Sequence, residues 1–391
     1  MNPPESPRQP LRPSPSAPAT LAVVIGRNPT RLWGMSSTER LNRSLKIAGI
    51  KDIRSFDRLG DFAGGTALVV SNDWVFDVSI IKGMATRPNI VVLDPQTQRP
   101  VAAHVDAAQL SAAIALIEQG EAALLPGVQQ LSAEDVGGNY NHELRKKESP
   151  YLLRLTPETL AAIERRMFSG SYKGVTDFVT KFWWPRPAEV VTRWCSHAGM
   201  SPNQVTLIGF FAVLISFWAF WNGHYLLGLA SGWLMTFLDT VDGKLARVTL
   251  TSSKWGNVFD HGIDLIHPPF WWWAWIVGLV AYGTPTPYAD LALWVILIGY
   301  VVQRLLEGIF MSLFDMHVHV WRRFDSFFRL ITARRNPNLV ILTPFALAGR
   351  PDLGILLVAL WTALSLVVHT VQILQGLVAR RHGPLRSWLA A

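Results

Sequence analysis

The sequence predicts an α-helical integral membrane protein of about six transmembrane helices, preceded by a cytoplasmic α/β domain. Three observations support this fold class. The 391 residues leave room for two domains, residues 203–379 carry long apolar runs, and residues 1–190 are of mixed polarity. Half of the chain is hydrophobic and only 16% is charged, so its net charge of +8 indicates a lipid bilayer as partner and no nucleic acid.

The chain divides into five segments. They are a Pro/Ser-rich disordered tail at 1–20, the α/β domain at 21–168, an interfacial amphipathic linker at 169–200, the six-helix membrane domain at 201–381 and a cytoplasmic tail at 382–391. The first segment lacks the apolar core of a secretory signal, so we expect the α/β domain to stay in the cytoplasm. The single cysteine, Cys195, excludes an internal disulfide.

The α/β domain is predicted from apolar strands that alternate with helical stretches. Leu21–Ile25 reads as a strand that leads into a turn at Gly26, and 41–48 reads as a helix. Residues 67–73 and 90–93 read as further strands. This alternation is typical of a mostly parallel sheet covered by helices.

The linker mixes aromatic and basic residues, from Phe178 through Lys181 to Arg186. Such a composition favours an amphipathic helix that lies in the membrane interface. The alternative is a linker whose tryptophans pack against the α/β domain.

Six apolar segments follow the linker. They are 205–221, 225–238 continuing toward Arg247, 258–282, 291–314, 339–348 and 353–378. A spanning helix needs ~20 residues. The second segment reaches this length only by including two aspartates, and the fifth is short.

Positive charge gives these segments an orientation. The loops predicted to lie inside, together with the C-terminal tail, contain Lys244, Arg247, Lys254, Arg322, Arg323, Arg329, Arg334, Arg335, Arg380, Arg381 and Arg386. The outer loops contain one basic residue, Arg350. The positive-inside rule therefore places both termini in the cytoplasm, as in a bacterial-type inner membrane.

One constellation of residues carries the chemistry. It has the form D-x2-D-G-x2-A-R, eight residues, then G-x3-D-x3-D, and it consists of Asp239, Asp242, Gly243, Ala246, Arg247, Gly256, Asp260 and Asp264. On two helices these spacings place four carboxylates on facing sides. An ionised aspartate costs ~2.5–3.5 kcal/mol near a bilayer centre, so the set calls for a counter-charge. Carboxylate oxygens suit Mg²⁺ or Mn²⁺, and two such ions can hold a pyrophosphate.

This pattern resembles the signature of the CDP-alcohol phosphotransferase (CDP-alcohol phosphatidyltransferase) family over about 200–381. The resemblance implies a transferase of phospholipid biosynthesis that moves a substituted phosphate from a CDP-alcohol to a hydroxyl group and releases CMP. It implies that Asp239, Asp242, Asp260 and Asp264 bind the metal ions, with Asp264 also acting as the base. Gly243, Ala246, Arg247 and Gly256 would then contact the CDP-alcohol. Members of this family commonly form homodimers.

Two neighbouring motifs extend the resemblance. Ser201–Thr206 resembles the entry to the family's first span, so Asn203 and Thr206 are candidate CDP-alcohol ligands, while the alternative is plain helix capping. The Asp-His-Gly-x-Asp run at 260–264 resembles the choline and ethanolamine phosphotransferase branch. It makes His261 a second catalytic candidate, against a purely structural alternative.

The sequence does not identify the acceptor. Arg322, Arg323, Arg334 and Arg335 form a candidate site for a phosphate on the acceptor, although positive-inside topology explains them equally well. Arg304 and Glu307 are expected to pair one helical turn apart. Either the donor carries the lipid and the acceptor is a polar alcohol phosphate, or a soluble CDP-alcohol reacts with diacylglycerol.

The first domain resembles the Rossmann-like nucleotidyltransferases that make NDP-sugars or CDP-alcohols. There, an acid at the position of Asp73 binds Mg²⁺. The loop that begins at Gly26 contains a single glycine. Residues 37–40 stand where the family has a Pro-Lys pair, and the second metal-binding acid, expected just before Thr156, is missing. These departures predict a degenerate domain that is catalytically silent, with Asp73 as a vestigial metal ligand.

Clustered intramembrane acids also occur in two other classes of protein, divalent-ion transporters or sensors and inactive pseudoenzyme scaffolds. A divalent-ion transporter or sensor would spread its acids across the bilayer, whereas here they cluster at one end of the apolar segments. An inactive pseudoenzyme scaffold would be expected to lack part of the eight-residue signature, which is complete.

Overall fold

The computed structural model describes residues 18–60, 62, 64–120, 125–141, 144–252 and 254–389. The side chains of Lys254, Trp255, Asn257 and Asp260 also lie outside this description. So do residues 1–17 of the predicted tail and residues 390–391 at the other end. The chain forms two compact units, one made of 1–139 with 149–160 and the other of 140–148 with 161–391.

The first unit is built on a mixed sheet. Its strands are β1 (Leu21–Ile25), β4 (Asp52–Ser55), β5 (Thr66–Ser71), β7 (Ile90–Leu93), β8 (Pro100–Asp106) and β9 (Gln129–Leu131). They pair in the order β4-β1-β5-β8-β7-β9. Because β8 is antiparallel to both of its neighbours and the other described pairings are parallel, five of these six strands run in one direction.

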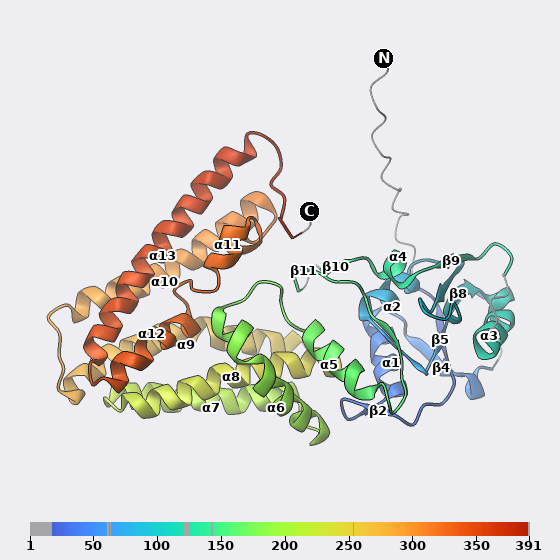
Figure 1. The fold of residues 1–391 in the computed structure, drawn as a ribbon, viewed down its shortest axis with the longest axis horizontal. Coiled ribbons are helices and arrows are strands. Elements are labelled where there is room, and N and C mark those ends of the chain that lie inside the picture. Colours follow the sequence, from blue (N-terminus) through green and yellow to red (C-terminus); the bar gives the residue numbers. More distant parts are fainter. Residues whose placement is uncertain are drawn as a thin grey trace, which may run out of the picture. The chain divides into compact units, whose positions relative to one another are not determined.

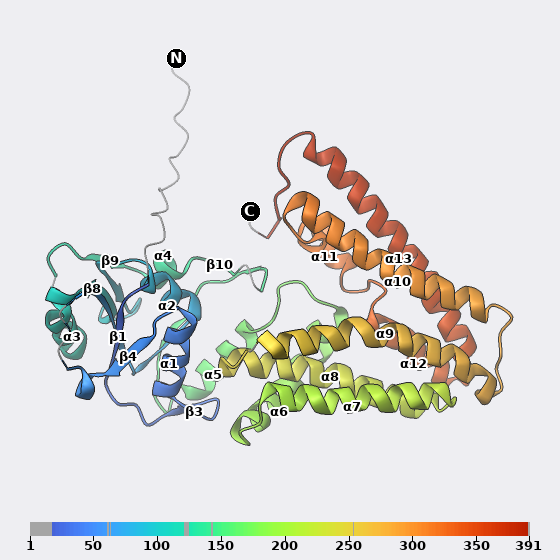
Figure 2. The ribbon, with the colours of Figure 1, turned by 180° about the vertical axis from the view of Figure 1, so that it is seen from behind.

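Helices cover the sheet on both faces (Figures 1 and 2). They are α1 (Ser37–Ile47), α2 (Val78–Ala85), α3 (Leu110–Gln119) and the short α4 (Ala133–Gly137). The strands are apolar on both sides, and β1 is buried throughout. One cluster contains Ala22, Leu45 and Ile80, and the other contains Val23, Val69 and Ile114. The predicted α/β layer is confirmed, and β8 is the reversed strand that the alternation did not reveal.

The boundary between the units lies earlier than residue 168. The hairpin of β10 (Tyr140–Asn141) and β11 (Lys146–Lys147) belongs to the second unit. Lys146 Nζ donates to the carbonyl of Gly170 at 2.7 Å, and Glu148 pairs with Arg166. These contacts tie the hairpin to α5 (Leu160–Gly170), which the sequence had placed in the α/β domain.

The second unit is helical. After α5 it contains a π-helical turn (Val179–Trp183), α6 (Pro185–His197), α7 (Pro202–Trp221), α8 (Tyr225–Thr249), α9 (Lys254–Tyr282), α10 (Ala289–Phe314), α11 (Arg323–Phe328), α12 (Arg335–Leu347) and α13 (Pro351–Arg380). Helix α7 packs on α8 and α9, and α10 runs alongside α13 (Figure 1).

Aromatic side chains fill the centre of this bundle. Trp271 and Trp275 on α9 are fully buried and contact Phe220 on α7 edge-on or tilted. At Gly278 a Cβ atom would lie 1.9 Å from the carbonyl oxygen of Phe220. Only glycine therefore allows α7 and α9 to approach so closely.

Three helices within the described residues are long and apolar enough to cross a membrane: α7, α10 and α13. Helices of this length and composition are typical of an integral membrane protein. All six predicted apolar segments are helical, but α12 has only 13 residues. At 1.5 Å per residue it is ~20 Å long, less than the ~30 Å of a bilayer core.

The linker before α7 forms α6, and aromatic and apolar side chains remain exposed along it. Phe182, Trp183, Val190 and Trp194 are each about half exposed or more. Helix α6 packs against α8. An exposed aromatic face is what an interfacial helix requires, and this role stays a prediction.

Candidate active site

Three helices of the second unit meet at Arg335. This residue begins α12, and its guanidinium donates through Nη2 to Asp239 Oδ2 on α8 at 2.6 Å. Through Nη1 it donates to Asp264 Oδ1 on α9 at 2.5 Å. The two halves of the sequence signature are thus brought together, as their spacing predicted.

A third signature acid is held from α7. Thr206 Oγ1 donates to Asp242 Oδ2 at 2.5 Å. At the start of α7, Ser201 and Gln204 form a reciprocal capping box, which confirms the capping interpretation of this entry. Thr206 therefore reaches the signature itself, whereas Asn203 is exposed in the first turn.

The carboxylate oxygens at this site are suited to binding a divalent cation. The Arg335 guanidinium already places a positive charge between Asp239 and Asp264, and carboxylate oxygens are the ligands that Mg²⁺ and Mn²⁺ prefer. Asp260 lies one helical turn before Asp264, but its side chain is outside the described residues. Among the side chains that are described, no group of three or more His, Cys, Asp or Glu is arranged to hold a metal ion.

Two cavities share the wall that contains Asp264 and Arg335. The smaller, of about 210 Å³, also contacts Asp239, Gly243, Lys244 and Arg247 of α8; we call it the signature cavity. The larger, of about 410 Å³, is lined by charged residues from α9 to α12 and from the segment before α6; we call it the basic cavity. His261 lines both cavities, whereas Ala246 and Gly256 are not among the lining residues of either.

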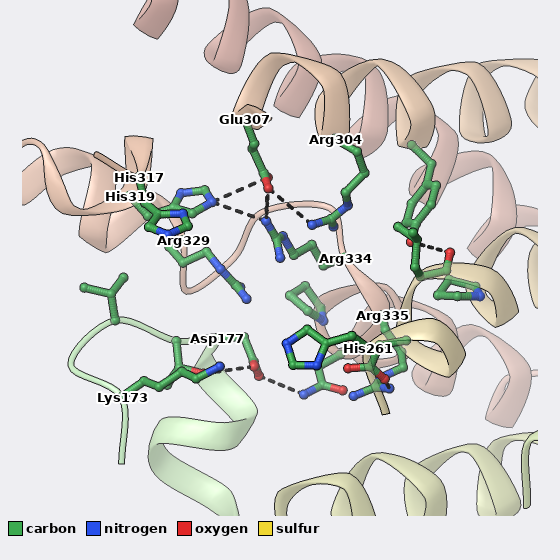
Figure 3. Close-up of a pocket in the computed structure, with 18 of the residues that line it drawn as sticks. Lys173, Asp177, His261, Arg304, Glu307, His317, His319, Arg329, Arg334 and Arg335 are labelled. Carbon is green, nitrogen blue, oxygen red and sulfur yellow. Dashed lines mark hydrogen bonds and ion pairs between the residues drawn. The ribbon is translucent and has the colours of Figure 1, made fainter. Parts of the chain in front are cut away.

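The basic cavity carries more positive than negative charge (Figure 3). Its cationic residues are Arg145, Lys173, Arg304, Arg329, Arg334 and Arg335, and its carboxylates are Asp177, Asp264 and Glu307. Burial, together with the nearby Arg334, lowers the pKa of Arg329 to about 9, so this side chain remains a cation at neutral pH. Its Nη1 is buried and has no hydrogen-bond partner within the described residues. Such an excess is suited to a phosphate group.

Glu307 holds two of these arginines in place. Its carboxylate accepts from Arg334 Nη2 at 2.5 Å and from Arg304 Nη1 at 3.2 Å, which confirms the predicted Arg304–Glu307 pair. His319 Nε2 lies 3.4 Å from the same carboxylate. Burial lowers the pKa of His319 to about 3, so the imidazole is neutral there.

Asp177 anchors the segment before α6 to α12. Its carboxylate accepts from Asn336 Nδ2 at 3.0 Å and from the hydroxyl of Thr180 at 2.8 Å. Burial disfavours the charged form, but attraction to Arg329 and these hydrogen bonds outweigh it and hold the pKa of Asp177 below its ordinary value. This anchor fixes one wall of both cavities.

The structure separates the four arginines of the predicted acceptor site. Arg334 and Arg335 line the basic cavity, but Arg322 and Arg323 do not. Arg322 is bound to Asp325 at 2.9 Å and stacks on Trp321, because it begins the short helix α11. The other cations of the basic cavity were not predicted from the sequence, because they come from elements that are distant in the chain and form no local pattern.

In the first unit, the predicted loop and acid do lie together. Gly26 adopts a left-handed φ of +82°, and the following turn brings Asn28 to Asp73. Asn28 Nδ2 donates to Asp73 Oδ1 at 3.2 Å and to the carbonyl of Leu155 at 2.9 Å. An amide therefore stands beside Asp73, and its metal role stays a prediction.

The part of the second unit that carries the signature aspartates resembles a known family. Residues 199–333 match the model of the CDP-alcohol phosphatidyltransferase family. An archaetidylinositol phosphate synthase of Pyrococcus horikoshii is 38% identical over 82 residues, which are 20% of this chain and 42% of that protein.

Two eukaryotic relatives match the same class. A choline/ethanolaminephosphotransferase of Arabidopsis thaliana is 35% identical over 121 residues, covering 27% of this chain and 29% of that protein. An ethanolaminephosphotransferase of Pongo abelii is 26% identical over 176 residues, covering 38% and 42%. The chain thus spans less than half the length of each of these curated relatives.

Proposed function

We propose that the helical unit transfers a substituted phosphate from a CDP-alcohol to a hydroxyl acceptor and releases CMP, in phospholipid synthesis. The observation that carries this proposal is the meeting of Asp239 and Asp264, from the two halves of the signature, at the wall between two cavities. One cavity then serves the nucleotide and the other the acceptor.

Asp264 is the base in this proposal. Its side chain is 40% exposed, against 22% for Asp239, so it is the more accessible of the two to an acceptor hydroxyl in the basic cavity. It takes the hydroxyl proton while the acceptor oxygen forms a bond to the β-phosphorus. The bond from that phosphorus to the CMP oxygen breaks, and CMP departs with the bonding pair. His261, which lines both cavities, is placed to assist this proton transfer.

The ligand roles follow the same division. Asp239, Asp242, Asp260 and Asp264 would hold Mg²⁺ or Mn²⁺, and two such ions would supply charge neutralisation for the pyrophosphate. Gly243 and Arg247 in the signature cavity contact the CDP part, with Ala246, Gly256, Asn203 and Thr206 as further candidates.

The basic cavity favours an acceptor that itself carries a phosphate. Arg329 Nη1 has no hydrogen-bond partner within the described residues, and a neutral diacylglycerol would offer this cation no charge. The Pyrococcus relative is an archaetidylinositol phosphate synthase, which agrees with a phosphorylated polar alcohol as the acceptor.

We further propose six membrane-embedded helices, α7 to α10 with α12 and α13, both termini in the cytoplasm and a bacterial-type inner membrane. The basic residues around α11 and beyond α13 support this orientation. The first unit is proposed to be a silent nucleotidyltransferase-like domain, and a homodimer is proposed from the family alone.

The test is CMP release by the purified full chain in detergent with Mg²⁺ or Mn²⁺. CDP-diacylglycerol is offered with glycerol phosphate or inositol phosphate, and CDP-choline or CDP-ethanolamine with diacylglycerol. Acceptor-dependent CMP from the first group is the expected result. CMP from the second group alone would contradict the acceptor assignment, and metal-independent binding without turnover would contradict the transferase.

A further inference from the structure

The β10–β11 hairpin brings an arginine to the basic cavity from outside the segment that matches the family. Arg145 lies in this hairpin and lines the cavity, whereas the family match begins at residue 199. The chain before the hairpin, up to Asn139, and the chain after it, from Ser149, belong to the α/β unit. The chain therefore leaves the α/β unit, contributes one cationic side chain to a cavity of the helical unit, and returns.

The backbone at Arg145 has a conformation that favours glycine. Its φ is +53°, in the left-handed region, which is costly for a residue with a Cβ atom. Such a conformation persists where the surrounding contacts enforce it, and it is common at functional sites. An arginine at this position indicates that its side chain has a role that glycine could not supply.

Contacts within the helical unit hold the hairpin at the cavity. The N–H of Gly174 donates to the carbonyl of Leu144 at 2.8 Å, and Lys146 Nζ donates to the carbonyl of Gly170 at 2.7 Å. A Cβ atom at Gly174 would clash with the carbonyl oxygen of Arg145, so only glycine allows the two segments to approach so closely. The residues on both sides of Arg145 are thus anchored, and its place at the cavity is fixed.

The guanidinium of Arg145 forms no ion pair with a carboxylate among the described residues. Glu307 attracts it, but that carboxylate already accepts from Arg304 and Arg334. Burial lowers the pKa of Arg145, and the like charge of Arg334 adds to this effect, yet a guanidinium stays protonated at neutral pH. A half-buried cation beside another cation is stabilised when an anion binds to it.

Arg145 lies in the part of the basic cavity that the signature cavity does not share. Asp264 and His261 line both cavities, whereas Arg145 and His317 line only the basic cavity. The α9 wall that carries Asp264 includes Pro268, the first of a proline pair, and no lysine or arginine among its described lining residues. Burial, and then the charge of Arg145, lower the pKa of His317, so this imidazole is neutral at pH 7. An acceptor whose hydroxyl reaches Asp264 at the shared wall therefore extends toward Arg145.

We propose that Arg145 binds the phosphate monoester of the acceptor alcohol and selects phosphorylated over neutral acceptors. The inference rests on the proposed function and assigns a residue to its acceptor. A guanidinium offers two parallel N–H donors to a phosphate, which matches a dianionic group at this end of the cavity. The α/β unit, proposed to be silent, would then be connected at both ends to an element of the acceptor site.

The experiment removes the side chain without straining the backbone. Arg145→Gly is suited to the left-handed φ, so the hairpin should stay folded, and Arg145→Lys keeps the charge but not the paired donors. Lys147→Ala is the matched control, because Lys147 lies in the same hairpin, is exposed and does not line the cavity. CMP release by the full chain is measured with CDP-diacylglycerol as donor and with glycerol phosphate or unphosphorylated glycerol as acceptor.

Arg145→Gly should raise the KM for glycerol phosphate about 10–100-fold, the loss expected for hydrogen bonds to a charged group, and Arg145→Lys should be intermediate. The rate with glycerol and the KM for the donor should stay within about twofold of wild type, as should every value for Lys147→Ala. An equal loss with both acceptors would indicate a merely structural role. A raised KM for the donor would place Arg145 at the donor phosphates, and either result would overturn the proposal.

Failure of the proposed function is distinguishable from failure of this inference. Binding of glycerol phosphate to the purified full chain is measured by isothermal titration without donor. Arg145→Gly should weaken this binding by a similar factor even if no CMP is released; the transferase would then be rejected while the phosphate site stands. If Arg145→Gly matches Lys147→Ala in both KM and binding, the site is rejected and the proposed function stands. A wild-type chain that neither binds glycerol phosphate nor releases CMP would reject both.

Discussion

Each of the two units has a predicted metal-binding aspartate at the end of an apolar element. The groups that contact this aspartate differ between the two units. In the α/β unit, Asp73 is contacted by the neutral amide of Asn28. In the helical unit, Asp239 and Asp264 share the guanidinium of Arg335. A lone acid beside an amide needs no counter-ion at a solvated sheet edge, whereas paired acids in a membrane domain require a cation. The difference supports the proposal that the chemistry takes place in the helical unit.

The largest effect should come from Asp264. Asp264→Asn removes the proposed proton acceptor and should lower the rate of CMP release by about 10²–10⁴-fold while CDP-alcohol binding is retained. Asp290→Asn, at an exposed aspartate near the start of α10, is the control and should be neutral. Steady-state CMP release with calorimetric binding checks both, and normal turnover of Asp264→Asn would remove the base assignment.

The next experiment compares the two units directly. Asp239→Asn should abolish Mg²⁺-dependent binding of a CDP-alcohol, because it removes one carboxylate from the proposed metal set. Asp73→Asn should leave that binding within about twofold, because the α/β unit is proposed to be silent. Isothermal titration with and without a chelator measures both. If Asp73→Asn were the variant that lost binding, the comparison would be reversed.

A smaller effect is expected for the acceptor. Arg334→Ala removes a charged donor from the basic cavity and should raise the KM for a phosphorylated acceptor roughly 10–100-fold, the equivalent of ~1.5–3 kcal/mol. Arg323→Ala is the matched control, since Arg323 is exposed beside Trp388 and does not line the cavity. Equal KM values for the two variants would argue against a phosphate site.

The smallest effect should come from Asn28. Asn28→Ala removes the hydrogen bonds that the Asn28 amide donates to Asp73 and to Leu155 and the one that it accepts from the Thr30 N–H, so it should lower the free energy of unfolding by ~0.5–1.5 kcal/mol for each bond. CMP release should be unchanged. Denaturant unfolding and CMP release measured on the same variant would show whether the stability of the α/β unit affects the activity of the helical unit.

Much of this architecture was predictable because its signals are local. Apolar runs located all six helical segments, and the three- and four-residue spacings placed Asp239 and Asp264 on facing helices. Parallel strands end at one edge, so the neighbourhood of Gly26 and Asp73 also follows from β1 and β5 being neighbours. The helical segments and the facing aspartates can therefore be predicted from periodicity alone.

The basic cavity was not predictable in the same way. Arg145, Arg304, Arg329 and Arg334 converge from separate elements, and periodicity carries no information about convergence. Arg322 does not line this cavity together with Arg334, because it pairs with the nearby Asp325 and donates to Gln375 of α13. Strand β8 was missed because Pro100–Asp106 begins with proline and is rich in alanine, which are weak strand formers.

The proline pair in α9 has a consequence for how this helix can be probed. Pro268 and Pro269 interrupt its ladder between the turn that carries Asp264 and the buried tryptophans. Amide hydrogens before the pair should therefore exchange with solvent deuterium as one group, faster than those around Trp271 and Trp275. A ligand that orders the first half should slow that group alone, giving a signal for occupancy that requires no turnover.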